Sequence, residues 1–252
     1  MLKVSARSQA TVEVVAEVLR DLAAVERTRA PSSRRRPLVT LAWAQSIDGS
    51  LALEAGRGVT LSGPASLALT HAVRAAHDAI LVGIETVLAD DPQLNVRHWT
   101  GRAPAPVVLD SRLRTPADAR VLASAGPGRI VRIACTAGAD AARVPALAAR
   151  GADVLRLPAW PNGWVDLGAL MEALAAAGVR RLMVEGGARV LTSFLRAELG
   201  DYAVVTVAPR FMGGLAAIGA LAGARAPRFA SVANHRLADD VILAGALEWG
   251  TA

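Results

Sequence analysis

The stretch Arg181-Leu-Met-Val-Glu-Gly-Gly-Ala188 decides the fold class, because a short apolar run enters two glycines and then a helical pattern. An apolar run without polar alternation is typical of a strand that helices cover on both faces, as in a parallel sheet. Two glycines let a backbone approach a bulky anion closely, and the N–H groups at the start of the next helix can hold a phosphate. A plain strand-to-helix turn would have the same sequence, so a ligand role stays open at this point.

Similar apolar runs precede this stretch and alternate with helical patterns. Strands are expected at Leu38–Trp43, Ala79–Gly83, Val107–Asp110, Ile130–Ala134 and Asp153–Leu157, and at Arg181–Val184 in the first stretch itself. Helices are expected at Pro64–His77, Asp140–Arg150, Asp166–Ala177 and Ala188–Glu198. This alternation predicts an α/β fold with a mostly parallel central sheet and helices on both faces. Three later strands have no clear helix between them and predict antiparallel C-terminal additions at one edge: Tyr202–Ala208, Pro227–Ser231 and Asp240–Glu248.

The front of the chain has a different pattern from the rest. Residues 10–29 repeat apolar side chains at helical spacing, which predicts an amphipathic helix. Residues 30–37 combine proline, serine and three arginines, which indicates a linker whose arginines are solvated rather than a phosphate site. We therefore expect residues 1–37 to be an N-terminal helix with a basic linker, an appendage to a domain of residues 38–252.

Charge and composition narrow the class of protein. The 252 residues are 53% hydrophobic, which excludes disorder, and carry a net charge of +6. Most of that excess lies in residues 1–37, and the remainder lacks the basic runs with stacking aromatics that nucleic-acid faces use. The apolar stretch Phe211–Ala224 is shorter than the roughly 20 residues that span a bilayer, and Cys135 alone makes no disulfide framework. We expect a cytoplasmic protein with no nucleic-acid and no membrane partner.

Polar clusters follow four of the predicted strands, where open α/β sheets bind their ligands. Each cluster alone would be compatible with an ordinary loop or cap. No histidine or third carboxylate recurs at ligand spacing, so no metal site is expected. The clusters are Gln45-Ser-Ile-Asp-Gly49, Thr86 with Asp90-Asp-Pro92, Asp110-Ser-Arg112, and Glu185 with its two glycines.

These segments together resemble the reductase domain of riboflavin biosynthesis, the C-terminal half of a bifunctional deaminase–reductase. The matching stretches, in family order, are Val39-Thr-Leu, Ser46-Ile-Asp-Gly49, Ser62-Gly-Pro64, Arg74 before Ala79-Ile-Leu-Val-Gly83, Thr86-Val-Leu-Ala-Asp-Asp-Pro92, Val108-Leu-Asp-Ser-Arg-Leu-Arg114 and Val184-Glu-Gly-Gly187. The resemblance implies a dihydrofolate-reductase-like fold and a homodimer. The zinc-site motif of the deaminase half is absent from this sequence.

The resemblance also implies an activity: an NADPH-dependent reductase that opens the ribose of a 5-amino-6-(5-phosphoribosylamino)pyrimidine, the uracil form above all, and delivers hydride to C1′ to leave a ribityl chain. Its catalytic residues would be Glu185 and Asp48. Its substrate-binding residues would be Arg74, Leu94, Arg97 and Glu185, with the two arginines on the 5′-phosphate. Its cofactor-binding residues would be Ala44, Thr60, Thr86, Asp90, Ser111, Gly186, Gly187, Ala188, Arg189, Val190, Leu191, Thr192 and Ser193.

The sequence departs from the family at two positions. Ala42 stands where the family often has a lysine, and Thr60 stands where an aromatic residue often flanks the cofactor. The first departure favours an alternative, a reductase of the same fold that acts on another pterin or pyrimidine. A further alternative is a non-catalytic module that binds a nucleotide.

Overall fold

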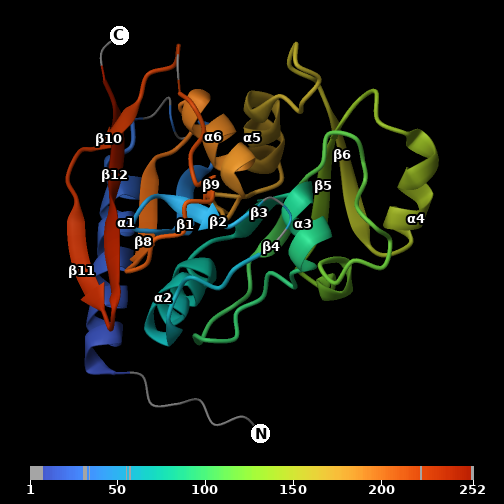
Figure 1. Cartoon of the computed structure of the whole chain (residues 1–252). Helices are drawn as coiled ribbons and strands as arrows, with labels where there is room; N and C mark the ends of the chain where they lie inside the picture. Colours follow the sequence, from blue (N-terminus) through green and yellow to red (C-terminus); the bar gives the residue numbers. More distant parts are fainter. Residues whose placement is uncertain are drawn as a thin grey trace, which may run out of the picture.

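A mixed β-sheet is the centre of the structure (Figure 1). The computed structural model describes residues 8–30, 33, 35–54, 56, 58–221 and 223–250, and within them the sheet has ten strands. Its order is β10-β12-β8-β1-β7-β3-β4-β5-β6, with β11 on β12. The parallel part is β1 Leu38–Ser46, β3 Ala79–Gly83, β4 Ala105–Leu109, β5 Val131–Thr136, β6 Ala152–Leu157, β7 Arg181–Val184 and β8 Tyr202–Ala208. The antiparallel part is β10 Pro227–Phe229, β11 Ala233–Leu237 and β12 Asp240–Trp249.

The expected fold class is confirmed, with differences in detail. β8 pairs parallel to β1, so the antiparallel part begins only at β12. β8 is parallel because a helix, residues 188–196, connects it to β7. Such a helical crossover lets the next strand run in the same direction. The sequence pattern missed β11 and a small separate ribbon of β2 Ser50–Ala52 and β9 Leu215–Ala216.

Helices cover both faces of the sheet. They are α1 Gln9–Thr28, α2 Pro64–Ala75, α3 Ile84–Asp90, α4 Val144–Ala148, α5 Leu167–Ala176 and α6 Ala188–Arg196. The single helix expected at Asp140–Arg150 is divided into a 3₁₀ turn, Ala141–Arg143, and the short α4. Pro145 stands in the first turn of α4, where its missing N–H leaves no bond unmade.

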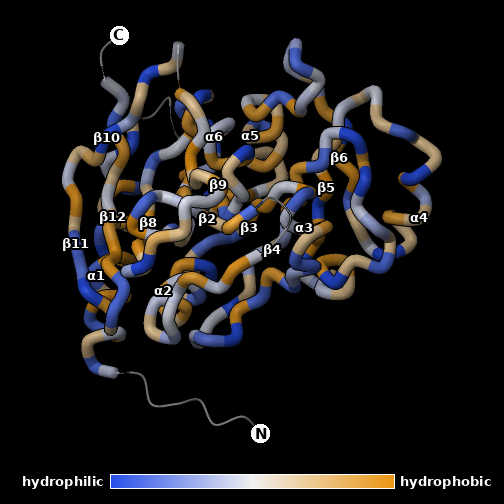
Figure 2. The backbone as a smooth tube through the Cα atoms, in the orientation of Figure 1, coloured by the Kyte–Doolittle hydropathy of each residue, from blue (hydrophilic) through white to orange (hydrophobic). Residues whose placement is uncertain are grey.

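The side chains of β1 alternate between the two cores. Val39 and Leu41 pack with α5 and α6, whereas Leu38 and Ala42 pack with α1 and α2. Figure 2 shows the hydrophobic colours gathered between sheet and helices. His77, at the end of α2, is bonded through Nε2 to Thr40 Oγ1 of β1 at 2.8 Å, and burial lowers its pKa to about 4. It therefore packs in the core as a neutral side chain.

The front segment packs onto the core of the sheet. Val14, Val15, Val18 and Leu22 of α1 are buried in one cluster with α2, β1 and β8. The division of the chain at residues 37 and 38 stays a prediction. In the linker, Pro31, Ser32 and Arg34 lie outside the described residues.

The expectation that the linker arginines are solvated is wrong for Arg36. The guanidinium of Arg36 donates from Nη1 and Nη2 to the two carboxylate oxygens of Asp201, at 2.7 and 3.0 Å. The same carboxylate accepts from the N–H of Val39 at 2.8 Å, and Arg29, only 8% exposed, lies 3.6 Å away. One carboxylate thus fixes the end of α1, the linker and the first residues of β1.

We expect Asp201→Ala to lower the free energy of unfolding by about 3 kcal/mol. The reason is that Arg36 and the buried Arg29 lose the carboxylate beside them. Urea unfolding followed by circular dichroism measures this loss. The control is Glu172→Ala, which removes an exposed carboxylate on α5. Equal losses in the two variants would contradict a role for Asp201 as an anchor.

Candidate active site

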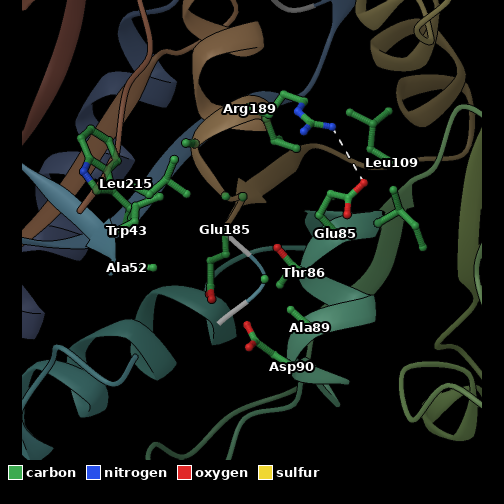
Figure 3. A pocket seen from close by; sticks show the side chains of 18 of the residues that line it. Trp43, Ala52, Glu85, Thr86, Ala89, Asp90, Leu109, Glu185, Arg189 and Leu215 are labelled. Carbon is green, nitrogen blue, oxygen red and sulfur yellow. Dashed lines mark ion pairs between the residues drawn. The ribbon is translucent and has the colours of Figure 1, made fainter. Parts of the chain in front are cut away.

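A cavity of about 980 Å³ lies at the carboxyl ends of the central parallel strands. Gly83 ends β3, Leu109 ends β4 and Glu185 follows β7, and all three line the cavity. Figure 3 shows this wall with Trp43 of β1, Thr86 and Asp90 of α3, and Arg189 of α6 around the same space. The edge of the sheet where open α/β folds bind ligands is therefore hollowed in this protein.

The N-terminus of α6 opens onto this cavity. Gly187 is its N-cap residue and supplies no side-chain acceptor, while the N–H groups of Val190 and Leu191 donate to the carbonyl of Gly187. Ala188 and Arg189 therefore keep backbone N–H groups without an acceptor in the described part of the chain. Such groups, with the helix dipole behind them, favour a bound anion.

Two glycines make room for Val190 of α6: Gly83 at the end of β3, and Gly186 in the turn before α6. A Cβ atom on Gly186 would lie 2.5 Å from Cβ of Val190, and one on Gly83 would lie 2.7 Å from Cγ2 of the same valine. Both separations are below any normal contact, so a side chain at either position would push α6 outward. Gly187 has room, since its nearest neighbour would be Thr86 Oγ1 at 3.9 Å.

Glu185 forms a two-point ion pair with Arg74 of α2. The Nε and Nη2 atoms of Arg74 donate to Oε1 and Oε2 of Glu185, each at 2.6 Å, and Nη1 donates to the carbonyl of Asn95 at 3.0 Å. The two side chains are 13% and 16% exposed. Burial by itself would lower the pKa of Arg74, but the neighbouring carboxylate outweighs it and the pKa is raised. The ion pair thus fixes the Glu185 carboxylate against α2.

A second group of residues, formed by His71, Asn95 and Arg97, adjoins Arg74. The N–H of Arg97 donates to Nδ1 of His71 at 3.1 Å, and its Nη1 donates to Oδ1 of Asn95 at 3.0 Å. His71 is buried, and burial together with the positive charges of Arg74 and Arg97 lowers its pKa to about 3. This histidine is therefore a neutral packing residue. Asn95 links the two arginines.

Comparison with known proteins identifies the family. The sequence model of the RibD C-terminal domain matches residues 37–243. The chain belongs to the RibD C-terminal domain family.

Relatives of the RibD C-terminal domain carry two names. The riboflavin biosynthesis protein RibD of Aquifex aeolicus is 35% identical over 75% of this chain, and the match spans 51% of that protein. The chain thus spans about half the length of the RibD proteins it matches. The 2,5-diamino-6-ribosylamino-4(3H)-pyrimidinone 5′-phosphate reductase of Methanothermobacter thermautotrophicus is 39% identical over 71% of this chain and 81% of its own length.

Solved structures agree on the fold. RibD of Acinetobacter baumannii superposes with a TM-score of 0.71 at 27% identity, over 86% of this chain and 59% of that one. The riboflavin biosynthesis reductase Rib7 of Saccharomyces cerevisiae gives a TM-score of 0.72 at 23% identity, over 94% and 100% of the two chains. Among the helices described here, none has the length and apolar character needed to cross a membrane.

The structure brings together most of the residues that the RibD resemblance assigns to a site. The assignments themselves stay predictions. Those that line the cavity are Ala44, Thr60, Thr86, Asp90, Ser111, Glu185, Gly186, Gly187, Ala188, Arg189, Val190 and Ser193. Those outside its lining are Asp48, Arg74, Leu94, Arg97, Leu191 and Thr192. Leu94 and Leu191 are buried in the core, and Thr192 Oγ1 accepts from the N–H of Gly219 at 2.8 Å.

Asp48 makes contacts typical of a structural residue. Its carboxylate accepts from Ser46 Oγ at 2.5 Å and from the N–H groups of Met212 and Gly213 at 3.0 and 2.7 Å. The bonds from Ser46 and Gly213 hold the pKa of this carboxyl well below its usual range. Asp48 thereby ties the turn after β1 to the loop before β9, and its catalytic role remains untested.

Several lining residues were not assigned from the sequence. Trp160 and Trp164 come from the loop between β6 and α5, where no motif points to them. Arg112 and Arg114 follow β4 within the quoted Asp-Ser-Arg-Leu-Arg stretch, which was the available signal. Leu51, Ala52 and Leu215 come from the small β2–β9 ribbon.

Gly186→Ala should lower the free energy of unfolding by about 1–3 kcal/mol, because its methyl group overlaps Val190. Gly187→Ala is the matched control and should cost under about 1 kcal/mol, since its Cβ has room. Thermal unfolding of both variants gives the comparison. A larger loss at Gly187 would show that the close contact of Gly186 with Val190 is not the constraint.

Proposed function

We propose that the chain is an NADPH-dependent reductase of a 5-amino-6-(5-phosphoribosylamino)pyrimidine, with the uracil form as its first substrate and the ribitylamino compound as its product. The observation that carries this proposal is the joint placement of the uncapped α6 N-terminus and the charged Glu185 in one cavity. The Methanothermobacter relative also supports the proposal. It is named as a reductase of such a pyrimidine, and the match covers 81% of its length.

The residues of the cavity fit a dinucleotide. The N–H groups of Ala188 and Arg189 can hold a pyrophosphate, and Gly187 keeps side chains away from it. Thr86, Asp90 and Ser111 would contact the remainder of the nucleotide along the same wall. When bound, the nicotinamide ring supplies the hydride.

The protein's own contribution would be position and charge. Glu185, which is held by Arg74, can accept hydrogen bonds from substrate hydroxyls at the carboxyl end of β7. Arg97 is exposed beside Asn95 and can pair with the 5′-phosphate. Holding the two reactants at a productive distance and angle removes much of the barrier to hydride transfer. The family resemblance further supports a cytoplasmic homodimer.

The test is oxidation of NADPH by the purified protein, followed by loss of the reduced nicotinamide absorbance, with the uracil form and the 2-amino-pyrimidinone form compared. We expect turnover with at least one of them and a faster rate with the uracil form. Turnover only with dihydropterins would show that the substrate is a pterin and not this pyrimidine. Tight NADPH binding without turnover of any of these compounds would make the chain a binding module.

Glu185→Gln should lower kcat by about a hundredfold or more and change the Kd for NADPH far less, because it removes a charge directed at the substrate. Steady-state kinetics and quenching of tryptophan fluorescence measure the two effects separately. Glu172→Gln, distant on α5, serves as the control. A variant with the wild-type rate would remove Glu185 from the mechanism.

A further inference from the structure

We propose that Trp164 is the surface on which the adenine base of the dinucleotide stacks. The inference rests on the proposed function, because it assigns a residue of this chain to one end of the cofactor which that function requires. Trp164 and its neighbour Trp160 both line the cavity, but they lie outside the stretches that resemble the family. Their role therefore has to be argued from the structure.

The two tryptophans are held on a tight hairpin between β6 and α5. The N–H of Trp160 donates to the carbonyl of Trp164 at 2.7 Å, and the N–H of Gly163 donates to the carbonyl of Trp160 at 2.8 Å. Gly163 has a φ of +78°, so the three residues between the tryptophans form the turn with a left-handed glycine that is typical of short hairpins. The loop thus fixes the backbone from which the Trp164 side chain extends.

A hydrogen bond ties this hairpin to the end of β4. The N–H of Val165 donates to Oγ of Ser111 at 3.1 Å, and Ser111 follows shortly after Leu109, the last residue of β4. Val165 is buried in the core cluster that includes residues of α5 and α6. Trp164 is therefore kept beside the part of the cavity wall that β4 supplies.

The packing of the two tryptophans differs. Trp160 is half-buried and packs against the same core cluster as Val165, whereas Trp164 remains 41% exposed. Small-molecule sites are lined by apolar and aromatic side chains of this kind. An indole has a flat π-face on which any nucleobase can stack. Core packing thus accounts for Trp160 and leaves the face of Trp164 to a ligand in the cavity.

The order of the strands gives the direction in which a dinucleotide would lie. Its two phosphates are at its centre, and the N-terminus of α6 is suited to them. The reacting end must lie toward Glu185 and β1, so the adenosine end extends the opposite way, past β3 to β4. Figure 3 shows Trp43 of β1 and Leu109 of β4 on opposite sides of the cavity. Trp164, tied to the end of β4, lies at the adenosine end.

The first experiment measures binding without turnover, by calorimetric titration with adenosine 2′,5′-bisphosphate and with NADPH. Trp164→Ala should raise the Kd of both ligands by about tenfold, because it removes one base–aromatic stack. Trp164→Phe keeps a ring and should raise both by less than about threefold. Reduced nicotinamide mononucleotide, which lacks the adenosine, should bind the wild type and both variants equally. Trp249→Phe, outside the cavity lining, is the matched control and should change none of these values.

Steady-state kinetics and fluorescence give two further readouts. With the pyrimidine substrate, Trp164→Ala should raise KM for NADPH by the same factor of about ten and leave kcat at saturating NADPH nearly unchanged. Adenosine 2′,5′-bisphosphate should quench the tryptophan fluorescence of the wild type and of Trp249→Phe, and should quench that of Trp164→Phe much less. If Trp164→Ala does not fold, this loss of quenching in Trp164→Phe carries the test.

Opposite outcomes overturn the inference. An unchanged Kd for adenosine 2′,5′-bisphosphate in folded Trp164→Ala, or full quenching in Trp164→Phe, would remove Trp164 from the adenine site. An equal loss of reduced nicotinamide mononucleotide binding in Trp164→Ala would mean that the substitution distorts the whole cavity. Loss of adenosine bisphosphate binding in Trp43→Phe instead would place the adenine at the Glu185 end.

Failure of the proposed function gives a different result. Wild-type protein that binds NADPH through Trp164 but reduces no pyrimidine would overturn the proposed reaction and leave the adenine site in place. Wild-type protein that binds neither NADPH nor adenosine 2′,5′-bisphosphate would overturn both.

Discussion

The close contact of α6 with β3 is the constraint on which the site depends. Val190 fits between Gly83 and Gly186 only because neither glycine has a side chain. This contact brings the uncapped start of α6 to the same edge of the sheet as Glu185, which follows the neighbouring strand β7. The uncapped helix terminus and the Glu185 side chain thereby open into one cavity, and the α/β topology supplies their common edge.

Buried ion pairs connect segments that are distant in the sequence. Asp201 joins the linker and the end of α1 to the start of β1, while Glu185 joins β7 to α2 across 111 positions. Burial makes both pairs costly to break on one side, since the remaining charge would have no partner. Arg36 of the linker, which the sequence predicted to be solvated, thus helps to fix the first strand.

Much of the fold was predictable because its strands are buried on both faces. Continuous apolar runs such as Ala79–Gly83 and Arg181–Val184 were found with their exact bounds. β11 was missed, since histidine and arginine are among its five residues and only Leu237 is buried. Three of the four polar clusters also contribute to the cavity wall, because the carboxyl ends of parallel strands meet at one edge of the sheet, whereas Gln45-Ser-Ile-Asp-Gly49 does not line it. The partner of Glu185 was not predictable, since no local spacing links it to Arg74.

Ala42 shows how the two halves of the site fit together. It lies on β1 beside β7, packs with the α1 and α2 side of the core and also lines the cavity. The guanidinium of Arg74, on α2, holds both oxygens of Glu185 at the end of β7. The sheet therefore supplies the place of Glu185 and the helix supplies its charge balance.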